Sequence, residues 1–241
     1  MATAAVPLGP GVWRIPTTRW DLVNSYAFRD DDGQVTLVDA GIRSAPPRIL
    51  AALEQIGSAP QDVTRLVLTH AHGDHAGGAE RLRSGLGLDG VTAHERDASY
   101  LRAGLSPADD STTTGRIVRR LGGFPAVPVV EELVDGQLLD VGGALRVIHT
   151  PGHTPGHVSL LHEPTRLLIT GDAVWNVFGT RTWPILALCT DAPMSMRTAG
   201  VLGELEYDMV AFTHGPEIRT GAREAVRSFL AHPRRFRWGL R

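Results

Sequence analysis

The segment THAHGDHAGG at positions 69–78 constrains this chain more than any other feature of the sequence. Its strong metal ligands are His70, His72, Asp74 and His75. The apolar run 66–68 precedes it and a helix is expected after it, so the segment is predicted to be a loop between a strand and a helix. His70 and His72 are two positions apart, whereas neighbours on one helix face are three or four apart. A loop lets both rings turn toward one ion, while the next two ligands can reach a second ion.

Three later strand ends carry the same ligand chemistry: His153, Asp172 and His214. Each follows an apolar strand or the turn after one. Imidazole and carboxylate together suit zinc, iron or manganese. Along the chain, the ligand order is therefore His-x-His-x-Asp-His, then His, then Asp, then His.

This ordered set resembles the signature of the metallo-β-lactamase-fold superfamily, and the resemblance covers nearly the whole chain. It implies an α/β fold, a four-layer αββα sandwich of two similar halves with the site at one edge of the sheets. It implies that the first metal is bound by His70, His72 and His153. It implies that the second is bound by Asp74, His75 and His214, with Asp172 bridging the two. Two Zn²⁺ ions per chain are the expected cofactor, with iron or manganese possible, and Asp74 is the expected catalytic residue because it would also orient the attacking hydroxide.

The residue at position 172 indicates a branch of this superfamily. Zinc β-lactamases typically have cysteine there or lack the bridging carboxylate, so Asp172 favours the branch of glyoxalase II and lactonases. Residues 215–241 are too few for the basic helical region with which glyoxalase II binds glutathione. We therefore expect a dinuclear zinc hydrolase of a small ester, thioester or lactone, in which metal-bound hydroxide attacks the acyl carbonyl.

Two alternatives stay open at this point. A mononuclear iron persulfide dioxygenase-like enzyme could draw its ligands from His70, His153 and Asp172. A non-catalytic metal-binding member of the fold is the other, and an intact ligand set argues against it.

Several further residues have two possible roles. Asp39, at a strand end, either supports the metal ligands from behind or caps a turn. Three aromatic residues either wall a substrate pocket or pack in the core: Trp175, Phe178 and Trp183. Cys189 is expected to pack, because the sequence places no base near it. Hydrogen bonding without metal is expected of His149, His157 and His162, and surface or packing roles of His94 and His232.

The pattern of apolar residues and turn signals predicts the remaining elements. The expected strands are 12–15, 23–28, 35–38, 63–69, 91–93, 145–148, 158–161, 167–170 and 209–212. The expected helices are 46–56, 79–86, one through 117–121, 195–205 with Ser195 as its N-cap, and 220–230. Residues 97–130 are either a lid or a packed connector, and the basic tail 234–241 is expected to fray.

The composition excludes several functional classes. Hydrophobic residues make up 42% of the 241 residues and the net charge is −2, so a single globular domain over 1–241 is expected, without affinity for nucleic acid or an anionic membrane. No apolar run approaches the roughly 20 residues of a membrane span, and no secretory signal is visible. We expect a cytoplasmic enzyme with a small-molecule substrate. The sequence leaves its oligomeric state open.

Overall fold

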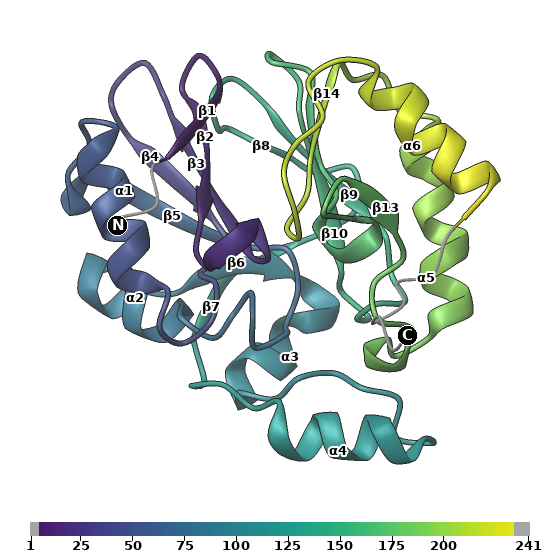
Figure 1. Ribbon diagram of the computed structural model, residues 1–241. Helices are drawn as coiled ribbons and strands as arrows, with labels where there is room; N and C mark the ends of the chain where they lie inside the picture. Colours follow the sequence, from purple (N-terminus) through teal and green to yellow (C-terminus); the bar gives the residue numbers. More distant parts are fainter. Residues whose placement is uncertain (1–4, 234–241) are drawn as a thin grey trace.

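The computed structural model describes residues 5–233, and Figure 1 shows two β-sheets face to face with helices on both outer sides. The strands of the first sheet are β1 (Val6–Gly9), β2 (Val12–Pro16), β3 (Asn24–Arg29), β4 (Val35–Val38), β5 (Val63–Leu68), β6 (Val91–His94) and β7 (Val129–Leu133). Those of the second are β8 (Leu138–Leu139), β9 (Leu145–His149), β10 (Val158–His162), β11 (Leu167–Ile169) and β14 (Met209–Ala211). A separate hairpin joins β12 (Trp175–Val177) and β13 (Thr180–Thr182).

The helices are α1 (Pro46–Gln55), α2 (Ala79–Leu86), α3 (Glu95–Ala103), α4 (Thr113–Leu121), α5 (Ala192–Thr198) and α6 (Ala222–Ala231). The helices other than α4 lie on the outer sides of the two sheets. Short 3₁₀ turns are η1 (Arg19–Asp21), η2 (Pro60–Asp62), η3 (Gly171–Ala173), η4 (Leu186–Leu188) and η5 (Ala199–Gly203).

Both sheets combine antiparallel and parallel pairing. In the first, the order is β1 to β7, antiparallel from β1 to β4 and parallel from β4 to β7. In the second, the order is β14-β11-β10-β9-β8, with only β11 and β14 parallel. Parallel strands end at the same edge, so the loops after them meet there.

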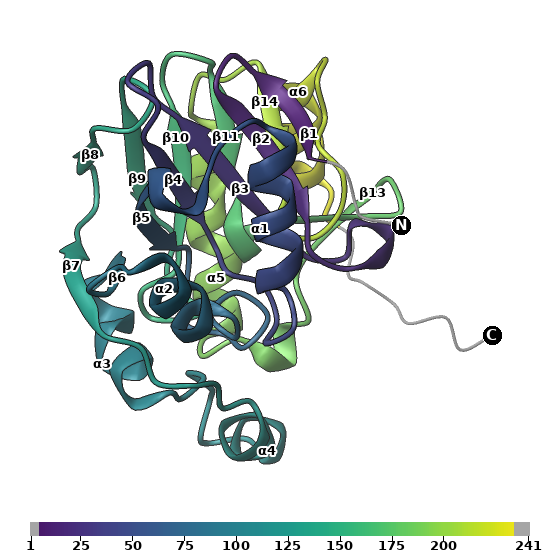
Figure 2. The same ribbon diagram turned by 90° about the vertical axis from the view of Figure 1, so that its left-hand side faces the viewer.

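Three apolar layers hold the fold together. Tyr26 and Phe28 of the first sheet share the central layer with Val147 and Leu160 of the second. A second layer packs α1 and α2 against the first sheet, and a third packs η5 and α6 against the other. Figure 2 shows α1 and α2 on the outside of the first sheet. The predicted four-layer αββα sandwich is confirmed.

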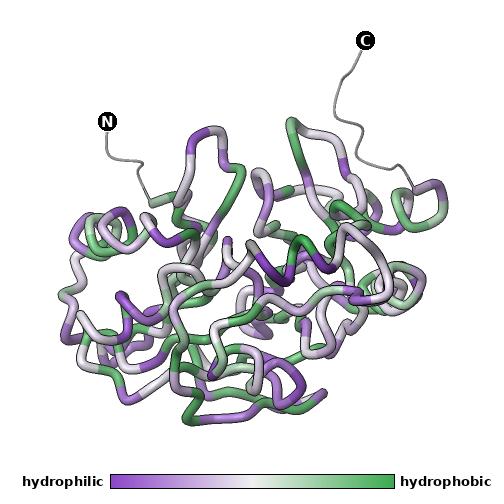
Figure 3. The backbone as a smooth tube through the Cα atoms, turned by 90° about the horizontal axis from the view of Figure 1, so that it is seen from below, coloured by the Kyte–Doolittle hydropathy of each residue, from purple (hydrophilic) through white to green (hydrophobic). Residues whose placement is uncertain are grey.

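Apolar residues are spread through both halves. Seen from below, the trace of Figure 3 alternates between hydrophobic and hydrophilic residues along its length in both halves. Within residues 5–233, no helix has the length and apolarity needed to cross a membrane.

The structure differs from the sequence prediction in several elements. The helix expected over 195–205 begins earlier, because Asp191 caps it by accepting a hydrogen bond from the Met194 N–H, and it tightens into η5 after Thr198. The sequence analysis missed β1, β7, β8, the β12–β13 hairpin and α3, all short or without clear periodicity. The expected fraying of 234–241 lies outside the described residues.

The first part of segment 97–130 has the connector role that was considered for it. Helix α3 packs on β6 and β7, as a connector would. Helix α4 instead lies apart from the two sheets, at the bottom of Figures 1 and 2.

Candidate metal centre

Loops that follow four strands bring the seven predicted ligands together. The loop after β5 holds the first four, and the turn between β9 and β10 holds His153. Asp172 lies in η3 after β11, and His214 follows β14. Residues from both halves of the chain therefore meet at one edge of the sandwich.

The seven side chains form three overlapping groups whose candidate ligand atoms lie within 4.8 Å of one another. We call His70, His72 and His153 the first cluster, and Asp74, His75 and His214 the second cluster. Asp172 links them, because its carboxylate oxygens lie 3.2 Å from His153 Nε2 and 3.2 Å from His214 Nε2.

His70 and His75 each form a hydrogen bond through their outer nitrogen, the one that faces away from the other ligands. These bonds show that the inner nitrogen, Nε2 in both rings, is free. The Thr69 hydroxyl donates to Asp39 at 2.8 Å, so its oxygen accepts from His70 Nδ1 at 3.1 Å. Asp39 Oδ2 accepts from His75 Nδ1 at 2.8 Å. Nε2 of both rings therefore carries a lone pair directed into the site when the imidazole is neutral.

The other three histidines are held in the same way. The Pro107 carbonyl accepts from His72 Nε2 at 3.0 Å, and the Leu22 carbonyl accepts from His214 Nδ1. His153 Nδ1 lies 3.4 Å from Cys189 Sγ. Partners on the outer nitrogen of a ligating histidine fix the ring and its tautomer, as protein metal sites require.

Two hydrogen bonds and the glycine before it position Asp172. Its backbone N–H donates to His157 Nε2 at 2.7 Å, and the Thr213 hydroxyl donates to its Oδ1 at 2.7 Å. Gly171 before it has φ +54°, and a Cβ there would lie 2.5 Å from His157 Nε2. Only glycine fits this close approach without strain.

Asp97, on the first turn of α3, joins two of the ligand loops. Its buried carboxylate accepts from the Ala71 N–H at 2.8 Å, the Thr154 hydroxyl at 2.6 Å and the Gly156 N–H at 2.7 Å. Ala71 lies between two ligands and Thr154 follows a third, so one carboxylate fixes the distance between the two loops. The sequence analysis missed this residue, because an acidic residue in a first helical turn normally needs no further explanation.

The buried charges shift the pKa values of the site in opposite directions. Burial lowers the pKa of His72 to about 4, helped by the neighbouring His153. Burial opposes a charge on His75 too, but Asp74, Asp172 and Asp39 together raise its pKa to about 9. Burial is likewise outweighed at His153, where the hydrogen bond to Asp172 raises the pKa to about 10. Metal binding must therefore displace protons from the last two rings.

The residues present fit divalent metal ions of the zinc type. His70 Nε2 is buried, and no hydrogen-bond partner for it exists within residues 5–233. His75 Nε2 faces His214 Nε2 at 3.3 Å, and both lone pairs need a shared cation or proton. Five imidazoles with two carboxylates make up a donor set that suits zinc, iron or manganese.

The remaining predicted residues take mostly structural positions. Cys189 is buried, and His157 is held by Thr150, as a hydrogen-bonding residue should be. His94 is buried, and its side chain caps α3 by accepting a hydrogen bond from the Arg96 N–H. Its ring stacks on that of His149, with the ring centroids 3.9 Å apart.

The three aromatic residues do not form a common wall. Trp175 lies 4.2 Å from the His214 ring, and Trp183 packs on Phe229 in the core. Phe178 is exposed.

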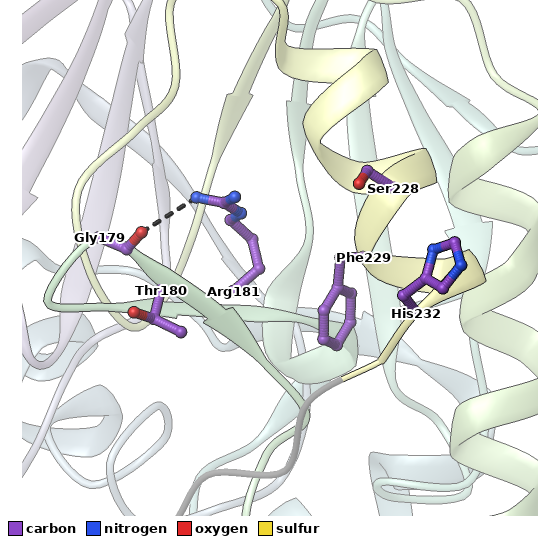
Figure 4. Close-up of a pocket in the computed structure, with 6 residues that line it drawn as sticks. All are labelled: Gly179, Thr180, Arg181, Ser228, Phe229 and His232. Atoms are coloured by element: carbon purple, nitrogen blue, oxygen red, sulfur yellow. Dashed lines mark hydrogen bonds between the residues drawn. The ribbon is translucent and has the colours of Figure 1, made fainter.

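A hollow of about 190 Å³ elsewhere contains none of these ligands (Figure 4). Its lining residues are Gly179, Thr180, Arg181, Ser228, Phe229 and His232. Arg181 donates to the Gly179 carbonyl of its own hairpin, and His232 is the only candidate metal ligand among the lining residues.

Comparisons with known proteins agree with this geometry. Residues 18–227 match the family model described as the metallo-beta-lactamase superfamily. The chain is 30% identical to the probable metallo-hydrolase YybB of Bacillus subtilis (strain 168), over 85% of this chain and 83% of that protein. It is 33% identical to a hydroxyacylglutathione hydrolase of Cereibacter sphaeroides (strain ATCC 17023), over 64% of this chain and only 49% of that enzyme. A metallo-beta-lactamase of Cronobacter sakazakii with a HARLDQ motif shares the fold, with a TM-score of 0.74, 22% identity and 95% of each chain covered.

Proposed function

Because the chain belongs to the metallo-β-lactamase superfamily and is a metal-dependent hydrolase, we propose that it is a dinuclear zinc enzyme that hydrolyses a small ester, thioester or lactone. The observation that supports this most is the arrangement of the five histidines. Each has its outer nitrogen beside a protein atom and its inner nitrogen directed to the same small volume as Asp74 and Asp172.

In this proposal the first cluster would hold one ion, the second cluster would hold the other, and Asp172 would be a ligand of both. Both halves of the chain supply ligands, so we also propose that they act as one domain. Divalent ions bound at such a site lower the pKa of water and polarise a carbonyl group.

The side chains then have distinct tasks. Asp74 is the partly exposed ligand, so it can accept a hydrogen bond from the attacking water and orient it toward the acyl carbon. Asp172 is buried and its pKa is held well below the usual range, since the charges on His214 and His75 outweigh its burial. It therefore stays ionised and offsets part of the metal charge.

The proposed reaction is the hydrolysis of an acyl compound by water. Water adds to the acyl carbon and the C–O or C–S bond breaks. The products are a carboxylic acid and an alcohol or thiol, or a hydroxy acid from a lactone. No serine or cysteine nucleophile is needed, because activated water replaces it.

The test combines metal analysis with a matched pair of variants. Elemental analysis should give close to two zinc-like ions per chain, and esters, thioesters or lactones should be hydrolysed only by metal-loaded protein. Asp74→Asn should lower kcat by on the order of 10²-fold, as for loss of one strong electrostatic group. Asp208→Asn, at an exposed ion pair with Arg166, is the control and should not change kcat. One tightly bound iron per chain, or normal turnover by Asp74→Asn, would contradict the proposal.

A further inference from the structure

An open hollow of about 380 Å³ lies directly beside the candidate metal centre. On one side it is lined by the ligand loop, through His72, Gly73 and Asp74. On the other side it is lined by Ser106, Ile117, Val118, Gly122 and Leu188. Its volume is at the lower end of the range for small-molecule sites, about 300–1,000 Å³.

The wall opposite the ligands is mainly apolar. Ile117 and Val118 come from α4, and Leu188 comes from η4. Ile117 is 53% exposed, although a large aliphatic side chain gains free energy from burial. The carboxylate of Asp74 across the hollow is the partly exposed member of the second cluster. An apolar surface left open beside a catalytic carboxylate is typical of a surface that a ligand covers.

The arginines of α4 do not line this wall, although the helix is rich in them. Arg119 pairs with Asp110, and Arg116 donates to the backbone carbonyls of Asp110 and Ser111. Arg120 is exposed on α4 without lining the hollow. Among the described residues, no arginine lines it, so an anionic group lying against the wall formed by α4 and η4, away from the metal ligands, would find no basic side chain there.

We propose that this hollow binds the acyl chain of the substrate, and that the substrate class is therefore an uncharged ester, thioester or lactone of an apolar acid. The proposal rests on the proposed hydrolase function and adds its specificity. The acyl carbonyl lies at the Asp74 side, and the alkyl chain extends along Ile117, Val118 and Leu188. Glutathione thioesters, which are anionic, are then poor substrates.

The first test is a series of neutral p-nitrophenyl esters from acetate to hexanoate, hydrolysed by the zinc-loaded protein. The value of kcat/KM should rise about fourfold per added methylene, because burying one methylene is worth about 0.8 kcal/mol. Ile117→Gln should flatten this dependence. Arg120→Gln, on the same helix but outside the hollow, is the matched control and should keep the full slope. The slope is that of log kcat/KM against the number of methylenes. A slope of zero in the unaltered protein, or equal slopes in the two variants, would overturn the proposal.

The second test compares charge at a constant acyl chain. S-hexanoyl-N-acetylcysteamine is neutral and S-hexanoylglutathione is anionic, so the first should have the higher kcat/KM by about tenfold or more, since the hollow offers no partner for the extra charges. A preference for the glutathione thioester would overturn the proposal.

A third measurement separates this proposal from the hydrolase function itself. Hexanamide is uncharged and carries the same chain, so calorimetry should detect its binding to metal-free protein, with weaker binding to Ile117→Gln than to Arg120→Gln. If zinc-loaded protein hydrolyses no acyl compound but hexanamide binds in this pattern, the proposed function fails and the apolar site stands. If esters are hydrolysed and hexanamide binds both variants equally, the apolar site fails and the function stands.

Discussion

The two ligand clusters differ in how much of them solvent can reach. All three histidines of the first cluster are buried. In the second cluster, the Asp74 side chain is 38% exposed and borders the apolar hollow. Both clusters border this hollow, the first through the buried His72 and the second through the more exposed Asp74.

The supports of the two clusters differ as well. Asp97 joins the two loops of the first cluster through three hydrogen bonds. The second cluster has Asp39 behind His75 and the Leu22 carbonyl behind His214, and Asp39 also supports His70 of the first cluster through Thr69. Asp39 adopts φ +60°, a conformation that costs free energy in a residue other than glycine and is often found at functional sites. The comparison teaches that Asp39 supports both clusters, whereas Asp97 joins only the loops of the first cluster and the most exposed ligand, Asp74, belongs to the second.

The largest effect is expected where the two clusters meet, at Asp172. Asp172→Asn removes the only carboxylate placed between both clusters within the described residues, so both metals should be lost. Activity should fall by more than about 10³-fold, beyond the loss from one electrostatic group. Elemental analysis after gel filtration measures metal content. Retention of one full equivalent of metal per chain would show that the two clusters bind metal independently.

A smaller and selective effect is expected from Asp97→Asn. An amide cannot accept all three hydrogen bonds, so affinity of the first cluster for cobalt should fall about 10–100-fold, as for other outer partners of metal ligands. The affinity of the second cluster for cobalt should change by less than about threefold. Competition with a chromophoric chelator measures both affinities.

Two further variants control for general destabilisation. Asp62→Asn removes the charge from the side chain that accepts from the Ala59 N–H, away from both clusters, and should leave both affinities unchanged. Gly156→Ala keeps every charge but places a Cβ 2.6 Å from the Asp97 nitrogen, so it should reproduce the selective loss. Equal weakening of both clusters by Asp97→Asn would contradict the distinction between them.

The affinity of both clusters for metal should rise with pH, up to a different limit in each. His75 has a pKa raised to about 9, so below that pH a proton must leave before the second cluster binds metal. Its affinity should therefore rise about tenfold per pH unit until pH 9 and then level off. In the first cluster, His72, with a pKa lowered to about 4, adds no such dependence near neutral pH, but His153, with a pKa raised to about 10, should extend the same rise in affinity to about pH 10. Calorimetry in buffers of different ionisation enthalpy counts the released protons, and a second-cluster affinity independent of pH from 6 to 9 would contradict this.

The smallest effect is expected from Cys189→Ala. Sulfur is a weak hydrogen-bond acceptor, and its 3.4 Å contact with His153 Nδ1 supports a ring that Asp172 also holds. We expect kcat and the affinity of the first cluster for metal to change by less than about threefold, because one weak hydrogen bond contributes little free energy. A covalent acyl group on Cys189 in a trapping experiment would overturn the water mechanism.

Spacing and residue type in the sequence indicated the fold and the seven residues of the proposed centre. Apolar runs that end in His or Asp predict strands that deliver ligands to a sheet edge, since the period of a strand and the chemistry of a ligand are local properties. The same local reasoning failed for the helix at 195–205, where the capping residue Asp191 lies outside the apolar pattern.

The tertiary structure alone decided how those side chains are held and what surrounds them. Two of the outer partners are backbone carbonyls, of Pro107 and Leu22, and a carbonyl is present at every residue, so no sequence pattern marks it. Asp97 and Ile117 lie far along the chain from the residues they face, on helices with ordinary composition. Their positions follow from the packing of α3 and α4 beside the ligand loops, which depends on contacts between distant parts of the chain.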